Sequence, residues 1–331
     1  MIRAVDLRTE YLKNPCALDI PFPRLSWKVE GAVRQTAFQV KASADGRVIY
    51  DSGKVVSSAM NDKYREPLES RSRISWKIRL WDEEDRCGEW SEEAFFETGL
   101  LKAEDWKAQW IDPEPAHDPE ERQPGSYLKR EFDVGRTGDA RLYITAHGVY
   151  EAWINGKRAG NFILAPGTSQ YDRRLQYQTY DVSPLLKAGR NEMVVSLGDG
   201  WWRGDTGYGG ERNSFGTDLA LLCQLEVDKR PVLLSDGEWL ASQNGPLRFN
   251  DLMQGECYDA RKEIIRDWHP VQEKNYGYHN LVCSNSFDVV EKERFTGKRI
   301  DTPDGSLVID FGQNIAGYVE FGVYAREGQK I

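Results

Sequence analysis

The sequence predicts an all-β protein made of several antiparallel sandwiches. Short runs in which polar and apolar residues alternate recur along most of the 331 residues, and we find no convincing amphipathic helix among them. The 11 Trp, 15 Tyr and 12 Phe residues favour sheets and surfaces lined by aromatic rings. The spacing of the runs divides the chain into residues 1–100, 101–285 and 286–331.

Residues 1–100 predict a small antiparallel sandwich. Leu25, Trp27 and Val29 alternate with polar residues, as do the apolar residues between Ile74 and Trp81, and Asp45-Gly46 marks a hairpin turn. About seven short strands at this spacing are typical of an immunoglobulin-like sandwich. The early Trp27, the strand from Ile74 to Trp81 and the closing Trp90-Ser91 resemble a fibronectin type III domain, in which such residues form the core.

Residues 101–285 begin with a linker that Trp106 and Trp110 anchor, and strands follow from Tyr127 on. Asn155-Gly156 is the strongest short hairpin signal of the chain. About ten strands without a helix favour a jelly-roll (galactose-binding-like) sandwich. The main predicted strands are Leu128–Val134, Ala140–His147, Val149–Ile154, Gln176–Val182, Glu192–Leu197, Leu219–Val227, Val232–Ser235, Trp239–Ser242 and Leu247–Asn250.

Residues 286–331 predict the start of a third β-sandwich. The apolar runs Phe287–Phe295, Ser306–Phe311 and Tyr318–Tyr324 each have the length and composition of a strand. About three strands can neither close a core nor hide their edges, so we expect this domain to be truncated.

The segment Gly198–Gly216 is the candidate binding site, because it places several aromatic residues among glycines between two predicted strands. The rings of Trp201, Trp202 and Tyr208 would stack on the flat C–H face of a sugar, whereas the alternative is that they plug the open end of a sandwich. In an extended loop, alternation would send only one of the two tandem indoles inward. The segment fits no dinucleotide fingerprint, since Arg203 stands where the third glycine is required.

Polar side chains that could orient sugar hydroxyls fall into two groups. Arg203 lies on the aromatic loop itself, and Asp172 and Arg174 lie beside Tyr171 in an irregular segment. These four residues complete the predicted sugar-binding set. The alternative for each charged group is an exposed loop ion pair of little energetic weight.

The charge balance excludes two classes of partner. A net charge of −9 argues against nucleic acid and against an anionic membrane surface, whereas neutral sugars are compatible with it. No apolar stretch approaches the roughly 20 residues that a membrane-spanning helix needs. The five cysteines and four histidines are scattered without metal-ligand spacing, so we predict no metal site and expect each histidine at the surface or beside a local partner.

The sequence assigns no catalytic residue and leaves the localisation open. Glu256 and Asp259 form a carboxylate pair, but on an irregular segment their spacing does not set the separation that glycoside cleavage needs. The start, Met1 to Asp6, has no apolar signal region, which predicts a soluble cytoplasmic protein. A chain from which a signal had been removed would look the same and would be periplasmic or secreted.

Several segments, taken in order, resemble the amino-terminal half of bacterial α-L-rhamnosidases. The resemblance covers nearly the whole chain, and in that family the motif from Gly255 to Arg261 is structural, so we expect Arg261 to pair with a carboxylate. The matching segments are Pro23 to Trp27, Gln35 to Val40, Ile154 to Lys157, Ala165 to Gly167, Tyr171-Asp172, Tyr177 to Val182, Gly198 to Gly204, Gly255 to Arg261 and Asp310 to Gly317.

The resemblance implies a role with carbohydrate. Some members bind rhamnose with calcium in the jelly-roll module, so a rhamnose-containing glycoside is the expected ligand and calcium is a candidate cofactor that wants six to eight hard oxygens. The family hydrolyses its substrate in an (α/α)6 barrel that follows; we expect this chain to lack that barrel and to be inactive alone. Candidate calcium ligands are Asp172, Asn191, Asp199, Asp205, Glu211, Asn213 and Asp218.

Sugar binding and support of the downstream catalytic domain are therefore the expected functions. Two alternatives stay open, namely a purely structural module that could form a homodimer and a stand-alone lectin-like protein.

Overall fold

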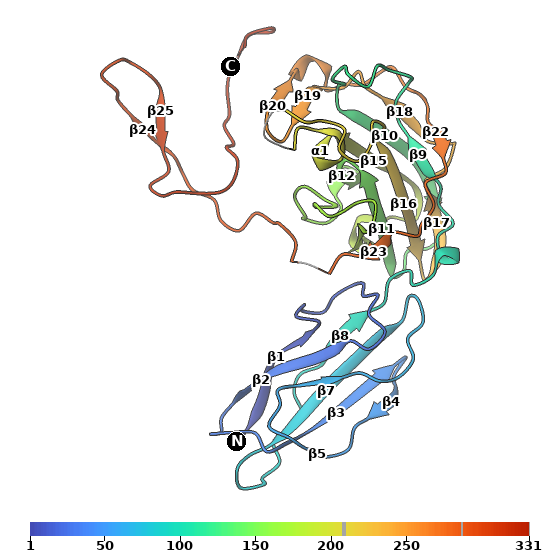
Figure 1. Cartoon of the computed structure of the whole chain (residues 1–331), viewed down its shortest axis with the longest axis vertical. Coiled ribbons are helices and arrows are strands. Elements are labelled where there is room, and N and C mark those ends of the chain that lie inside the picture. Colours follow the sequence, from blue (N-terminus) through green and yellow to red (C-terminus); the bar gives the residue numbers. More distant parts are fainter. Residues whose placement is uncertain (207–209, 286, 331) are drawn as a thin grey trace.

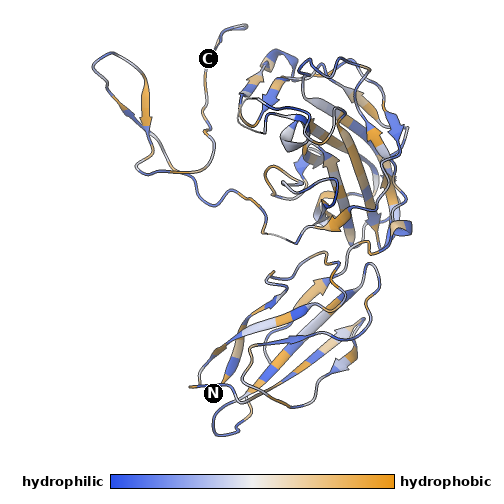
Figure 2. Cartoon of the chain, viewed as in Figure 1, coloured by the Kyte–Doolittle hydropathy of each residue, from blue (hydrophilic) through white to orange (hydrophobic). Residues whose placement is uncertain are grey.

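The computed structural model describes residues 1–206, 210–285 and 287–330. Two β-rich domains follow one another along the long axis of the molecule, and the C-terminal segment, residues 287–330, extends away from the second domain (Figure 1). Apolar residues recur along the strands of both domains (Figure 2). Among the described residues, no helix is both long and apolar enough to cross a membrane.

The first domain has two sheets that share one core. Their strands are β1 (Arg3–Thr9), β2 (Arg24–Glu30), β3 (Ala37–Ala44), β4 (Arg47–Asp51), β5 (Val55–Val56), β6 (Asn61–Lys63), β7 (Arg73–Trp81) and β8 (Ala94–Glu97). One sheet has the order β1-β2-β6 and the other β4-β3-β7-β8, with β5 paired to β3. The predicted alternation along β7 is confirmed, because Trp76 and Ile78 are buried while Lys77 between them reaches the surface.

The second domain has two large sheets and a small two-stranded one. Its elements are η1 (Ala103–Asp105), β9 (Trp110–Asp112), β10 (Ser126–Val134), β11 (Ala140–His147), β12 (Val149–Ile154), β13 (Lys157–Arg158), β14 (Leu175–Asp181), η2 (Ser183–Leu185), β15 (Gly189–Gly198), α1 (Gly200–Arg203), β16 (Ala220–Val227), β17 (Arg230–Leu234), β18 (Leu240–Ser242), β19 (Leu247–Asp251), β20 (Gly255–Tyr258), η3 (Ala260–Lys262), β21 (His269–Pro270), β22 (Gln272–Lys274) and β23 (Leu281–Cys283).

The main core of this domain lies between the two large sheets. One sheet has the order β13-β12-β15-β10-β18-β21 and the other β22-β9-β16-β11-β14-β23, with β17 paired to β16. Leu128, Met193 and Val195 of the first sheet belong to the same buried cluster as Leu142 and Leu225 of the second. The hairpin predicted at Asn155-Gly156 is confirmed: both residues have a positive φ and join β12 to β13.

A second buried cluster lies where the two domains meet. It combines Ala17 and Leu100 of the first domain with Trp106, Tyr177 and Cys283. The hydroxyl of Tyr177 accepts a hydrogen bond of 2.9 Å from the backbone N–H of Leu100. The first domain therefore contacts the second through packed side chains as well as through the covalent linker.

The C-terminal segment differs from the prediction. Its only strands among residues 287–330 are β24 (Lys298–Ile300) and β25 (Val308–Asp310), which form one antiparallel hairpin. The run Ser306–Phe311 thus contains a strand, but Phe287–Phe295 and Tyr318–Tyr324 lie in none. The physical reason is the lack of a packing surface, because an isolated hairpin buries too little apolar area to order further strands.

Candidate functional site

The aromatic loop is not extended around its tandem indoles. Residues Gly200–Arg203 form the short helix α1, so the expectation that strand alternation would orient Trp201 and Trp202 was wrong. Gly200 has a φ of +54°, and a Cβ atom there would lie 2.6 Å from Cγ1 of Val149. Glycine is needed at this position for both its backbone conformation and its closeness to β12. Both indoles are half-buried as a result.

Trp202 belongs to a stack of rings. Its indole lies parallel to the imidazole of His147, at 3.8 Å between centroids and 9° between planes, and Trp110 covers the other side of the imidazole at 4.4 Å. The indole N–H of Trp202 donates to the carbonyl of Asp218 at 3.0 Å. Tyr171 and Phe215 complete the surroundings of this indole at 5.8 and 6.2 Å. Trp202 therefore anchors the loop to the sheet that contains β11.

The predicted sugar-binding residues do not share one environment. Tyr171 is buried, and its hydroxyl donates to the carbonyl of Gly167 at 2.6 Å. Asp172 and Arg174 are exposed, and Asp172 forms its ion pair with Arg173 at 3.6 Å. Trp201 is half-exposed and packs against the cluster at the domain junction. Tyr208 lies outside the described residues.

Arg203 is the most deeply buried cation near this loop, with a side chain only 2% exposed. Its Nη1 and Nη2 atoms donate to the carboxylate of Glu114 at 2.5 and 2.8 Å, and its Nε atom donates to Asp199 at 2.8 Å. Burial alone would lower the pKa of Arg203, but its hydrogen bonds to Glu114 and the charge of Asp199 raise it. In this conformation the guanidinium holds the loop to the segment around Glu114 and has little surface for a ligand.

A second ion-pair group holds the loop just after α1. Arg122 donates to Asp205 at 2.9 and 3.0 Å and to Asp251 at 3.1 Å. Burial by itself would raise the pKa of Asp251, but backbone N–H groups, that of Asp205 first among them, hold it below its ordinary value. Asp205 and Asp251 thus share Arg122 as their ion-pair partner.

This donor set does not fit calcium. Asp199 and Asp205 already accept hydrogen bonds from Arg203 and Arg122, and Asn191 accepts from the side chain of Asn155 and the backbone of Lys187. In the described part of the chain, no three His, Cys, Asp or Glu side chains are grouped so that they could hold a metal ion. A cation would have to displace arginines that are bound in favourable geometry.

Asp259 of the bridging segment forms an ion pair within its own turn. Asp259 accepts hydrogen bonds from the backbone N–H, Nε and Nη2 of Arg261, and these contacts hold the pKa of Asp259 at about 2. The expected pairing of Arg261 with a carboxylate is confirmed.

Two residues of this region were missed by the sequence analysis. His147 is 4% exposed and its Nδ1 atom has no hydrogen-bond partner, so the expectation of a surface or locally satisfied histidine was wrong for this residue. Glu114 was not among the predicted site residues. The only signal for His147 is its place at the end of the apolar strand β11; no local pattern connects Glu114 to Arg203.

Comparisons with known proteins relate this chain to one family. Residues 135–295 match the model of the α-L-rhamnosidase N-terminal domain, and residues 4–102 match that of the Rha78A-like N-terminal immunoglobulin domain. An α-L-rhamnosidase of Formosa agariphila is 31% identical over 91% of this chain, which covers 35% of that relative. One of Streptomyces avermitilis is 25% identical over the whole chain, which covers 50% of that relative.

Solved structures show the same relationship. The α-L-rhamnosidase of Aspergillus terreus superposes with a TM-score of 0.86 at 28% identity, over 95% of this chain and 39% of that one. The Streptomyces avermitilis enzyme, crystallised with L-rhamnose, superposes with a TM-score of 0.85 at 25% identity, over 95% of this chain and 49% of that one. The chain thus spans between about a third and a half of the length of these relatives. It belongs to the α-L-rhamnosidase family, of which it represents the N-terminal β domains.

Proposed function

We propose that this chain is a non-catalytic front portion of an α-L-rhamnosidase that supports an (α/α)6 catalytic barrel. Its first domain would be a fibronectin type III-like sandwich, its second a jelly-roll sandwich, and its C-terminal segment the start of a third β-domain. The downstream barrel is the expected partner, and a terminal rhamnoside is the expected substrate of the whole enzyme.

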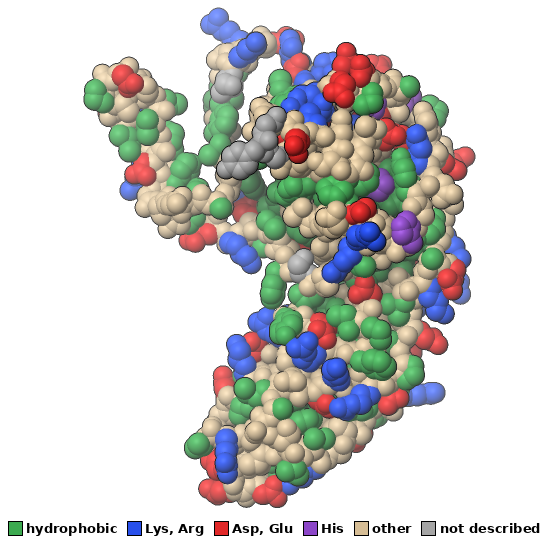
Figure 3. All heavy atoms as spheres, in the orientation of Figure 1, with side chains coloured by type: hydrophobic (Ala, Val, Ile, Leu, Met, Phe, Trp, Pro, Cys, Tyr) green, Lys and Arg blue, Asp and Glu red, His purple; other side chains and the backbone are tan. Residues whose placement is uncertain are grey.

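The observation that supports this role best is the apolar surface of the C-terminal segment. Figure 3 shows apolar side chains along much of this extended segment. Water contact of so many large apolar groups is unfavourable, and such surfaces mark places where another part of a protein binds. Side chains at least 39% exposed are Phe287, Val289, Ile300, Leu307, Val308, Ile309, Ile315, Tyr318, Val319, Phe321, Val323 and Tyr324.

A split-enzyme experiment tests the supporting role. The 331-residue chain is co-expressed with the part of the Formosa agariphila relative that follows the matched region, and hydrolysis of an aryl α-L-rhamnoside is measured. We expect the chain to be inactive alone and to raise the activity and the melting temperature of the helical part. A chain that ends at residue 290 should give no rescue; equal rescue by this shorter chain would contradict the proposal.

Sugar binding at the aromatic loop is a second candidate function. It is favoured by the half-exposed indole of Trp201. This residue lies in α1, whose position is fixed by the buried contacts of Arg203 and Trp202. Rhamnose should then quench the tryptophan fluorescence of the chain, and Trp201→Phe should remove the quenching. Trp268→Phe is the matched control, because that indole contacts Lys129 of β10 and the carbonyl of Ile265. If the emission did not change at tens of millimolar rhamnose, support of the catalytic barrel would be the only proposed function that remains.

A further inference from the structure

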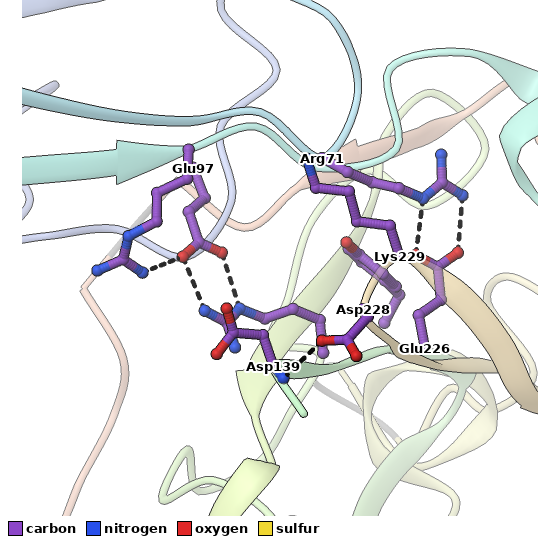
Figure 4. A pocket seen from close by; sticks show the side chains of 9 residues that line it. Arg71, Glu97, Asp139, Glu226, Asp228 and Lys229 are labelled. Carbon is purple, nitrogen blue, oxygen red and sulfur yellow. Dashed lines mark hydrogen bonds and ion pairs between the residues drawn. The ribbon is translucent and has the colours of Figure 1, made fainter. Parts of the chain in front are cut away.

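Two arginine–glutamate pairs cross the junction between the first and second domains in opposite directions. One arginine belongs to the first domain and binds a glutamate of the second, and the other arginine belongs to the second domain and binds a glutamate of the first. The two pairs lie on either side of a cavity of about 240 Å³ (Figure 4).

The first pair joins Arg71, which precedes β7, to Glu226 on β16. Nε and Nη2 of Arg71 each donate to one carboxylate oxygen of Glu226 at 2.7 Å, which is the bidentate geometry. The side chain of Glu226 is 2% exposed and that of Arg71 is 17% exposed. Burial alone would lower the pKa of Arg71, yet the bond to Glu226 raises it.

The same arginine also binds the linker. Its Nη1 atom donates to the carboxylate of Asp105 at 2.9 Å, and its Nη2 atom donates to the carbonyl of Asp105 at 3.2 Å. Gln224 donates to that carbonyl at 3.1 Å and to Glu226 at 2.7 Å. The first domain, the linker and β16 are therefore joined at one point by a continuous set of hydrogen bonds.

The second pair joins Arg141 on β11 to Glu97 at the end of β8. Nε and Nη2 of Arg141 each donate to Glu97 at 2.7 Å, and the two side chains are 13% and 10% exposed. Arg73 of the first domain adds a third donor to the same carboxylate at 2.5 Å. In both pairs, the glutamate of one domain is thus bound by the planar guanidinium of an arginine from the other domain.

Such pairs contribute more to geometry than to stability. The cost of removing charges from water offsets much of their attraction, but a bidentate contact tolerates little rotation of one partner against the other. With one such contact, the first domain could still rotate about that contact relative to the second domain. A second contact on the other side of the cavity prevents this rotation. The direct apolar contribution of the first domain is small, since Ala17 and Leu100 are its only residues in the buried cluster at the junction among the described residues. Domains that share a small interface otherwise move relative to one another.

We propose that the Arg71–Glu226 and Arg141–Glu97 pairs together fix the angle between the first and second domains, so that the two move as one rigid body. The inference concerns this chain's own geometry and does not depend on sugar binding or on support of a barrel.

Two native cysteines allow a direct test. Cys87 of the first domain and Cys257 of the second are exposed, whereas Cys223 and Cys283 are buried. Nitroxide labels are attached to Cys87 and Cys257 in a Cys16→Ser background, and the distance distribution is measured by pulsed electron paramagnetic resonance. We expect one narrow distribution for the unaltered junction. The double variant Glu97→Gln/Glu226→Gln, which removes both charges but keeps the side-chain size, should broaden it about twofold or more.

Two further variants keep the test decisive. Glu30→Gln removes the carboxylate of the Arg3–Glu30 pair, which is exposed and lies within the first domain, so it should leave the distribution narrow. Arg71→Lys/Arg141→Lys keeps both charges but removes the bidentate contacts, so it should broaden the distribution even if the glutamine variant does not fold. Circular dichroism establishes which variants are folded. A distribution as narrow as that of the unaltered junction in either folded double variant would overturn the proposal.

Discussion

The imidazole of His147 and the indole of Trp202 lie parallel at 3.8 Å, although the histidine ends a β-strand and the tryptophan belongs to a helical turn. This contact joins the aromatic loop to the sheet, and it leaves Nδ1 of His147 buried without a hydrogen bond. A neutral imidazole suits this place better than a charged one, because burial lowers the pKa of His147 from 6.5 to about 3.

The stability of the second domain should therefore depend on the protonation of His147. Between pH 6.5 and 3 the unfolded chain binds a proton at His147 that the folded chain does not bind, so the free energy of unfolding falls as the pH decreases through this range. Above pH 6.5 the free energy of unfolding is not reduced by protonation of His147. Near pH 5 the loss from this residue is about 2 kcal/mol.

His147→Phe keeps an aromatic ring in the stack and removes the titration. Urea unfolding between about pH 7 and pH 4 should show a shallower loss of stability for this variant than for the wild type. The exposed His279, replaced by Gln, serves as the control and should leave the pH dependence unchanged. Parallel pH profiles for His147→Phe and the wild type would show that the imidazole does not titrate as described.

Glu114→Ala should destabilise the chain strongly. The substitution leaves the guanidinium of Arg203 buried with only Asp199 as a charged partner, and loss of one member of a buried pair costs about 3 kcal/mol or more. Glu30→Ala, at an exposed pair, should stay within about 0.5 kcal/mol of the wild type. Urea unfolding of both variants gives the comparison, and similar values for the two would argue against the buried network.

Gly216→Ala should displace Trp202. A Cβ atom at Gly216 would lie 2.7 Å from Cζ2 of this indole, so the ring must leave its stack on His147. We expect a shifted near-ultraviolet circular dichroism spectrum and a loss of about 1–3 kcal/mol of unfolding free energy. Gly135→Ala is the control, because no heavy atom lies within 4 Å of the added methyl group there. An unchanged spectrum for Gly216→Ala would contradict the described packing.

Removal of residues 291–331 should lower the binding of a dye such as anilinonaphthalene sulfonate. The removed part carries most of the exposed apolar side chains of the C-terminal segment, and Val289, whose carbonyl accepts a hydrogen bond from Ile163, is retained. The urea midpoint of the remaining chain should not change, since the described residues 291–330 contribute nothing to the buried clusters. A large fall in this midpoint would mean that the segment stabilises the second domain.

Local patterns predicted the sheets well and the loop poorly. The predicted ranges Ala140–His147 and Val149–Ile154 match β11 and β12 residue for residue, because alternation and the Asn155-Gly156 turn are local signals. The helix α1 is too short for a helical period to show in the sequence. The partner of Arg203 stands 89 positions earlier, and such a contact is visible only in the folded chain.

In the C-terminal segment, local patterns predicted more strands than the structure contains. Its composition is that of strands, yet apolar residues between Tyr318 and Tyr324 form none in this structure. Strand propensity depends on a surface against which the side chains can pack, and the sequence of one segment does not supply that surface.

The parallel pairing of β23 with β14 has a consequence for synthesis of the chain. Cys283, the last residue of β23, donates from its backbone N–H to Asp19 of the first domain at 2.8 Å, and its Sγ atom lies 2.8 Å from the hydroxyl of Tyr177. The first domain leaves the ribosome early and can fold there, since domains generally fold as units from the N-terminus. The contacts of Cys283 with Asp19 and Tyr177, however, form only when residue 283 has emerged, so a nascent chain arrested shortly before that point would hold the first domain through the Arg71–Glu226 and Arg141–Glu97 pairs without them.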